Sequence, residues 1–112
     1  MPNKFEVTDP RGYQITCPDW AWEHIIGDRP WMDTEDWVQD IQRTVEKPTM
    51  GIYQDADFDA RIVYYAFRLK GKERYVKVVV EITGEKVGQI ITAYQVKTPK
   101  AGEKLIWLTS KT

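Results

Sequence analysis

The chain has 112 residues, of which 42% are hydrophobic, 12% aromatic and 29% charged. This length and balance favour one folded domain with a single core and argue against a disordered chain. The single cysteine, Cys17, excludes an internal disulfide, and no apolar run approaches the ~20 residues that span a bilayer. We therefore expect one cytoplasmic domain over residues 1–112, without membrane contact.

Charge is divided unevenly along the chain. Residues 1–60 carry 13 acidic and 5 basic side chains, a net charge of -8, whereas residues 61–112 carry 4 acidic and 11 basic, a net charge of +7. Such an asymmetry can steer an anionic ligand toward the basic half, or it can reflect two layers of structure that attract each other. Both interpretations stay open at this point.

The chain begins with a predicted β-hairpin. Polar and apolar residues alternate in residues 4–7 and again in residues 13–16, as expected for two strands. Between them, Pro10 and Gly12 occupy the second and fourth positions of a turn, which are the positions that these residue types favour.

Two short helices are predicted next. Pro18 suits the first position of a helix, and apolar residues then recur at helical spacing until Gly27. Asp33 or Thr34 can cap the second helix, which also has acidic residues in its positive first turn. Pro48 ends that helix.

The apolar pattern then changes to a period of two, with β-branched and aromatic residues in most positions. The predicted strands are residues 51–53, 61–69, 74–82, 89–96 and 105–108. The loops between them are too short for a parallel crossover, so consecutive strands must be antiparallel. The sequence therefore predicts an α+β fold, in which an N-terminal β-hairpin and two short helices precede an antiparallel meander of about four strands.

His24 is the only histidine, and an imidazole is the side chain that most readily exchanges protons near neutral pH. It is therefore the first candidate for acid–base chemistry, although an exposed histidine near the end of an amphipathic helix explains it equally simply. One histidine and one cysteine are too few ligands for a zinc site. We expect no metal and no cofactor.

Lys77 is a charge in the middle of an otherwise apolar strand. Alternation places it on the face opposite the neighbouring valines. If the valine face packs on the helices, Lys77 lies on the open face of the sheet, where Arg61, Tyr65 or Arg68 of the preceding strand can join it. The alternative is a lysine that extends along the sheet surface into solvent.

Thr92 and Tyr94 share one face of the strand at residues 89–96. A hydroxyl and a phenol side by side on a basic sheet can hydrogen-bond phosphate oxygens, and a tyrosine can also stack on a base. In the alternative interpretation they only fill positions that favour β-branched and aromatic residues.

Short motifs follow one another in a recognisable order between residues 20 and 108. They are WEHII at 22–26, RPWM at 29–32, EKP at 46–48, IY at 52–53, Arg61 before YY at 64–65, YVKVVV at 75–80, ITAY at 91–94 and GEKLIW at 102–107. Together they resemble the phage- and mobile-element-associated branch of the barnase/EndoU/colicin/RelE-like nuclease superfamily.

The resemblance implies RNA cleavage without metal, through a 2',3'-cyclic phosphate. It implies that His24 is the general base or acid. It also implies that Arg61 and Lys77 neutralise the charge that grows on the phosphate in the transition state. Thr92 matches the family's Thr-Ala-Tyr strand, and the resemblance implies that it orients the phosphate or the 2'-hydroxyl.

Substrate contacts follow from the same resemblance. Tyr94 belongs to the same strand motif as Thr92, and we expect Tyr65, Arg68 and Trp107 to contact RNA beside it. The second histidine that relatives often carry after the first helix is replaced here by residues 29–31, Arg-Pro-Trp. One of the two proton-transfer groups must therefore be another side chain or be absent.

We thus predict a metal-independent endoribonuclease-like domain, a toxin or phage-linked effector, with a protein antitoxin or immunity protein as partner. The alternative is a noncatalytic module that binds RNA or another protein, with the acidic half or the aromatic loop around Trp31 as the contact surface. The nuclease requires His24, Arg61 and Lys77 to converge on one phosphate, and the module does not.

Overall fold

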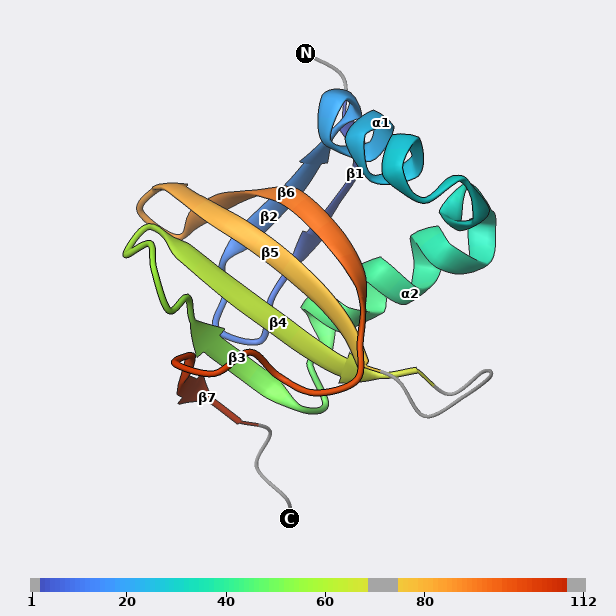
Figure 1. The fold of residues 1–112 in the computed structure, drawn as a ribbon. Coiled ribbons are helices and arrows are strands. Elements are labelled where there is room, and N and C mark those ends of the chain that lie inside the picture. Colours follow the sequence, from blue (N-terminus) through green and yellow to red (C-terminus); the bar gives the residue numbers. More distant parts are fainter. Residues whose placement is uncertain (1–2, 69–74, 109–112) are drawn as a thin grey trace.

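The structure is a computed structural model and describes residues 3–68 and 75–108. Its strands are β1 (Asn3–Thr8), β2 (Gln14–Pro18), β3 (Gly51–Gln54), β4 (Arg61–Phe67), β5 (Tyr75–Gly84), β6 (Val87–Val96) and β7 (Lys104–Trp107). The helices are α1 (Asp19–Asp28), the 3-10 turn η1 (Pro30–Met32) and α2 (Glu35–Glu46) (Figure 1). The predicted strand ends at residues 69 and 74 lie outside the described residues.

Within these residues, seven strands form one curved sheet in the order β1-β2-β6-β5-β4-β3-β7 (Figure 1). Strands β3 to β6 pair consecutively and antiparallel, but β2 pairs with β6 in parallel. The predicted α+β class, with a hairpin and two helices before the main strands, is confirmed. The antiparallel meander of about four strands is wrong in detail, because the hairpin joins the sheet through β2 and extends it into a mixed one.

The parallel pair has a physical explanation in the length of chain between its strands. Both helices and three strands separate β2 from β6, which is more than enough chain for a parallel crossover. Residues 14–16 of β2 pair with residues 87–89 of β6. The Gln14 amide also donates to the Lys86 carbonyl oxygen at 2.8 Å.

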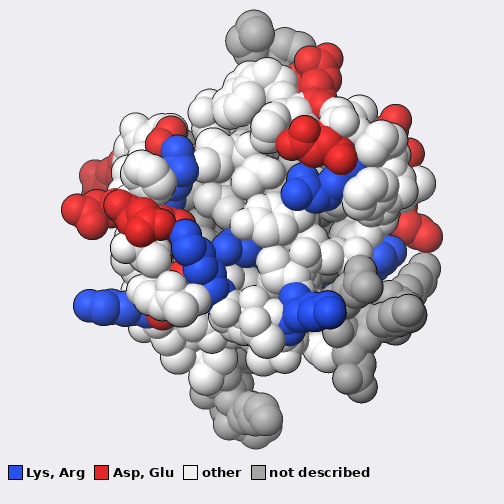
Figure 2. Space-filling view, in the orientation of Figure 1, with Lys and Arg blue, Asp and Glu red and all other residues white. Residues whose placement is uncertain are grey.

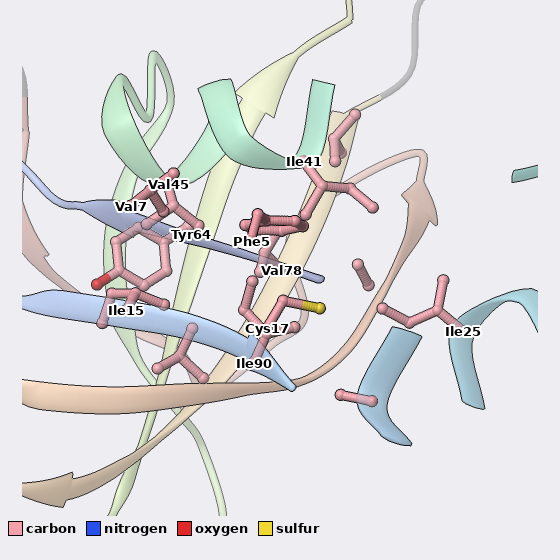
Figure 3. Close-up of a cluster of buried hydrophobic side chains, with 14 of the residues drawn as sticks. Phe5, Val7, Ile15, Cys17, Ile25, Ile41, Val45, Tyr64, Val78 and Ile90 are labelled. Carbon is pink, nitrogen blue, oxygen red and sulfur yellow. The ribbon is translucent and has the colours of Figure 1, made fainter. Parts of the chain in front are cut away.

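Helices α1 and α2 pack on the same face of the sheet and form the core with it (Figure 3). Thr34 caps α2, since its hydroxyl accepts the Trp37 amide at 3.2 Å. Buried Ile41 and Val45 then lie one turn apart and face Tyr64 and Val78 of the sheet. Each large apolar side chain buried in this way contributes roughly 1.5 to 3 kcal/mol.

Neither helix in the described part of the chain is long and apolar enough to cross a membrane.

Cys17 lies at the centre of this core and is fully buried. Burial, with a smaller contribution from nearby Asp19, raises the pKa of its thiol from 9.0 to about 12. Because the folded thiol holds its proton more tightly than the unfolded one, its effect on stability is absent below about pH 9. It becomes destabilising as the pH rises toward 12.

We therefore expect the native thiol to be inert to a disulfide reagent such as DTNB at pH 8 and to react stoichiometrically in denaturant. The absorbance of the released thionitrobenzoate measures the reaction of the thiol in the folded and in the denatured protein. Rapid labelling of the folded protein would contradict the burial of Cys17.

Candidate functional site

The face of the sheet opposite the helices carries most of the residues that the sequence singled out. Register places Tyr65, Lys77 and Tyr94 directly opposite one another on β4, β5 and β6. Thr92 lies in the next row, opposite Val79. We call this surface the open face; it is turned toward the viewer in Figures 1 and 2.

Lysine and arginine side chains surround the middle of the open face, and aspartate and glutamate lie mainly along its rim (Figure 2). The basic half of the sequence supplies β4 to β7, which form most of this surface. The charge asymmetry of the sequence therefore becomes a spatial asymmetry, with a basic centre and an acidic rim.

Lys77 is buried on this face, with only 4% of its surface exposed. Its ammonium nitrogen lies 3.1 Å from Oε2 of Glu103, and it lies 5.7 Å and 5.6 Å from the ring centroids of Tyr65 and Tyr94. A lysine is tolerated in such a place only when a carboxylate compensates its charge. Glu103 supplies that carboxylate from the turn before β7.

Glu103 also fixes the segment that crosses the open face. Its side chain is 1% exposed, and its Oε1 accepts a hydrogen bond of 2.5 Å from the Tyr65 hydroxyl. The Lys100 amide donates to the same oxygen at 3.2 Å and to the Tyr65 hydroxyl oxygen at 3.3 Å. Burial and the Glu103 hydrogen bond hold the pKa of the Tyr65 phenol well above its ordinary value.

The end of α1 reaches the edge of the open face at β6. The guanidinium carbon of Arg29 lies 4.9 Å from the ring centroid of Tyr94. Asp28 lies between Arg29 and His24, with its Oδ2 4.0 Å from the Arg29 Nη1 and 3.7 Å from the His24 Nε2. A chain of contacts therefore links the imidazole, whose side chain is 55% exposed, to Tyr94.

The three residues expected to act on one phosphate are spread over the molecule. Arg61 lies 4.1 Å over the Phe58 ring and 3.8 Å from Glu81. Glu81 is on the same strand as Lys77 and roughly 13 Å along it at 3.3 Å per residue. Among the contacts of the described residues, none joins His24 to Arg61 or to Lys77.

Arg68 and Trp107 lie on the helix side of the sheet and not beside Lys77, and their contact with RNA stays a prediction. Arg68 stacks 3.8 Å over the Trp37 ring and donates to Asp40 at 3.1 Å, both in α2. It lies an odd number of residues after Arg61, so alternation itself puts the two on opposite faces. Trp107 pairs with Ile52 and packs against the core.

Sequence reasoning missed Arg29, Asp28 and Glu103. Glu103 had one usable signal: a lysine inside an apolar strand requires a carboxylate, and residues 61–112 contain only four acidic candidates. For Arg29 and Asp28 the sequence carries no such signal. A local pattern does not show that the end of α1 lies beside β6, a strand more than 60 residues later.

In the ranges 3–68 and 75–108, no three histidine, cysteine, aspartate or glutamate side chains lie close enough together to hold a metal ion. In comparisons with known proteins, the sequence matches no family model and no curated protein, and the fold matches no solved structure. The nuclease resemblance of the motifs therefore stays a prediction.

Proposed function

We propose that this protein binds single-stranded RNA on the open face, with Tyr94 and Arg29 as the central contacts. One observation supports this most strongly: the centroid of the half-buried Tyr94 ring lies 4.9 Å from the Arg29 guanidinium carbon and 5.6 Å from the Lys77 ammonium nitrogen. Aromatic rings stack on bases of any sequence, and a guanidinium can stack on a base or contact a phosphate. The nucleic acid is taken to be RNA because of the motif resemblance.

Two exposed lysines of the basic half are suited to the phosphates: Lys97, three residues after Tyr94, and Lys104, at the start of β7 on the far edge of the sheet. Lys97 and Lys104 are exposed and form no ion pair with any residue that the structure describes, whereas Lys77 is neutralised by Glu103. We therefore assign Lys77 to the support of the face and the exposed cations to phosphate contact. The association constant for RNA should fall as salt is added. For each phosphate contacted, its base-10 logarithm should fall by about 0.7 for a tenfold increase in salt concentration.

Fluorescence anisotropy with a labelled oligouridine tests the proposal. We expect saturable binding that Tyr94→Ala weakens about 5- to 160-fold, since stacking contributes about 1 to 3 kcal/mol per base. Trp20→Ala is the matched control, because Trp20 is an exposed aromatic near the start of α1, and its removal should leave affinity unchanged. Equal binding by wild type and Tyr94→Ala, or equal affinity of the wild type for a deoxyuridine oligonucleotide of the same length, would contradict the proposal.

RNA cleavage is a second candidate, favoured by the position of Asp28 between His24 and Arg29. A carboxylate beside an imidazole orients the ring, as a group that transfers protons requires. The contacts through Asp28 and Arg29 link that imidazole to Tyr94 and support a role for it in the proposed site.

Incubation with RNA in EDTA, followed by analysis of the product ends, tests this second candidate. We expect 2',3'-cyclic phosphate ends and a loss of at least about 10²-fold in rate for His24→Ala. Glu23→Ala, a neighbouring exposed position of α1, is the control. Intact RNA with wild type, or cleavage that survives His24→Ala, would reject catalysis by His24.

A further inference from the structure

A cleft of about 220 Å³ lies on the helix side of the sheet, away from the open face. The second half of α2 forms one wall, and the end of β4 with the start of β5 forms the other. Ala66 and Val76 are cross-strand partners and form the apolar floor. The small side chain of Ala66 leaves room that a larger residue would fill.

The interior of the cleft offers few free polar groups. The Thr44 hydroxyl donates to the Asp40 carbonyl oxygen at 2.7 Å, and the Thr49 hydroxyl oxygen accepts the Phe67 amide at 3.0 Å. The hydroxyl groups of both threonines therefore already form hydrogen bonds with the protein backbone. A group that enters the cleft must be mainly apolar.

The mouth of the cleft is positively charged. Asp40 pairs with Arg68 at 3.1 Å and with Arg43 at 3.4 Å, so one carboxylate is shared between two guanidinium groups. Lys47 also lines the cleft, and in the described chain it forms no ion pair. With one anion against three cations, the lining has a net charge of +2.

We propose that this cleft binds a small amphipathic carboxylate, whose apolar body lies against Ala66 and Val76 and whose charged end meets Lys47 and Arg43. Benzene occupies an apolar cavity of about 150 Å³, so the present volume accommodates a body of about nine non-hydrogen atoms. An apolar interior with an uncompensated cation at its mouth selects an anionic ligand over a neutral or cationic one of the same shape. The site is independent of RNA binding, because it lies on the opposite face of the sheet.

Calorimetric titration with 3-phenylpropionate tests the inference, with 3-phenylpropan-1-ol and 3-phenylpropylamine as ligands of the same shape. For a ligand of this size we expect a Kd of roughly 0.1 to 1 mM for the acid. We expect the amine to bind at least about tenfold more weakly, because it meets like charge. Lys47→Ala should weaken binding of the acid about three- to tenfold and leave binding of the alcohol unchanged. Lys104→Ala should change the affinity for neither ligand.

Ala66→Leu fills the floor of the cleft and should abolish binding of both acid and alcohol. Since that variant can also disturb the core, Lys47→Ala carries the decisive comparison, because Lys47 is exposed and its replacement leaves the packing intact. Absence of acid binding up to 10 mM, equal binding of acid and amine, or an acid affinity unchanged by Lys47→Ala would each overturn the inference.

Discussion

Replacing Lys77 by methionine is expected to lower the free energy of unfolding by about 3 to 5 kcal/mol. Methionine matches the length of the lysine stem, so packing against Tyr65 and Tyr94 is largely preserved. What is lost is the charge that compensates Glu103, whose side chain is 1% exposed. The remaining carboxylate would be an uncompensated buried charge, and that penalty dominates the effect.

Urea unfolding of four proteins measures this prediction: wild type, Lys77→Met, Glu103→Gln and the double variant. Either single variant should be strongly destabilised. The double variant should recover most of the loss, because a neutral pair leaves no buried charge. Lys104→Met, at an exposed position, is the control and should lie within about 0.5 kcal/mol of wild type. A loss below about 1 kcal/mol in both single variants would show that the pair is solvated and not buried.

The same double variant separates two roles of Lys77. If Lys77 only supports the open face, the double variant retains most of its RNA affinity, because Tyr94 and Arg29 are unchanged. If Lys77 contacts the phosphate, the double variant loses affinity although its stability is restored. The structure favours the first result, since the ammonium is 3.1 Å from a carboxylate and only 4% of the residue is exposed.

Asp9→Ala is expected to destabilise the protein by a similar amount, about 3 to 5 kcal/mol. Asp9 is 3% exposed, and its carboxylate accepts the Tyr64 hydroxyl at 2.6 Å and the amides of Arg11 and Tyr13 at 2.8 and 2.9 Å. The Arg11 guanidinium donates to it at 3.1 and 3.2 Å. Burial, with the hydrogen bond to Asp9, also holds the pKa of Tyr64 above its ordinary value.

Removal of Asp9 leaves a buried hydroxyl and two turn amides without an acceptor, and it releases the hairpin between β1 and β2 from the core. Thermal and urea unfolding measure the loss. Tyr64→Phe removes only one of these bonds and should be milder, at about 1 to 3 kcal/mol. Asp59→Ala, at an exposed position, should have little effect. A stable Asp9→Ala variant would contradict a structural role of this carboxylate.

Local patterns predicted the parts of the fold that depend on local chemistry. The proline and glycine of residues 9–12 predict the turn there, and of the two predicted caps of α2, Asp33 and Thr34, the structure shows Thr34. That Asp9 also accepts a bond from Tyr64, 55 residues later, had no local signal. The parallel pairing of β2 with β6 was likewise hidden, because alternation fixes which face a residue occupies and not which strand lies beside it.

In the candidate site, too, local patterns predicted some features, whereas others depend on contacts between distant parts of the chain. Alternation correctly placed Arg61, Tyr65 and Lys77 on one face, because the strands at β4 and β5 are regular and antiparallel. Alternation also puts Arg68, seven residues after Arg61, on the opposite face of the sheet. The pairing of Lys77 with Glu103 depends on how the segment before β7 returns across the sheet, and no periodicity encodes that path.

The most direct test of RNA binding on the open face is a titration of the ¹⁵N-labelled protein with oligouridine, followed by amide chemical shifts. We predict that the largest changes occur at Arg29, Thr92 and Tyr94 and at neighbouring positions of β4 to β6, with α2 little affected. Spectra unchanged at a large excess of RNA, or changes confined to α2 and the cleft beneath it, would contradict that prediction.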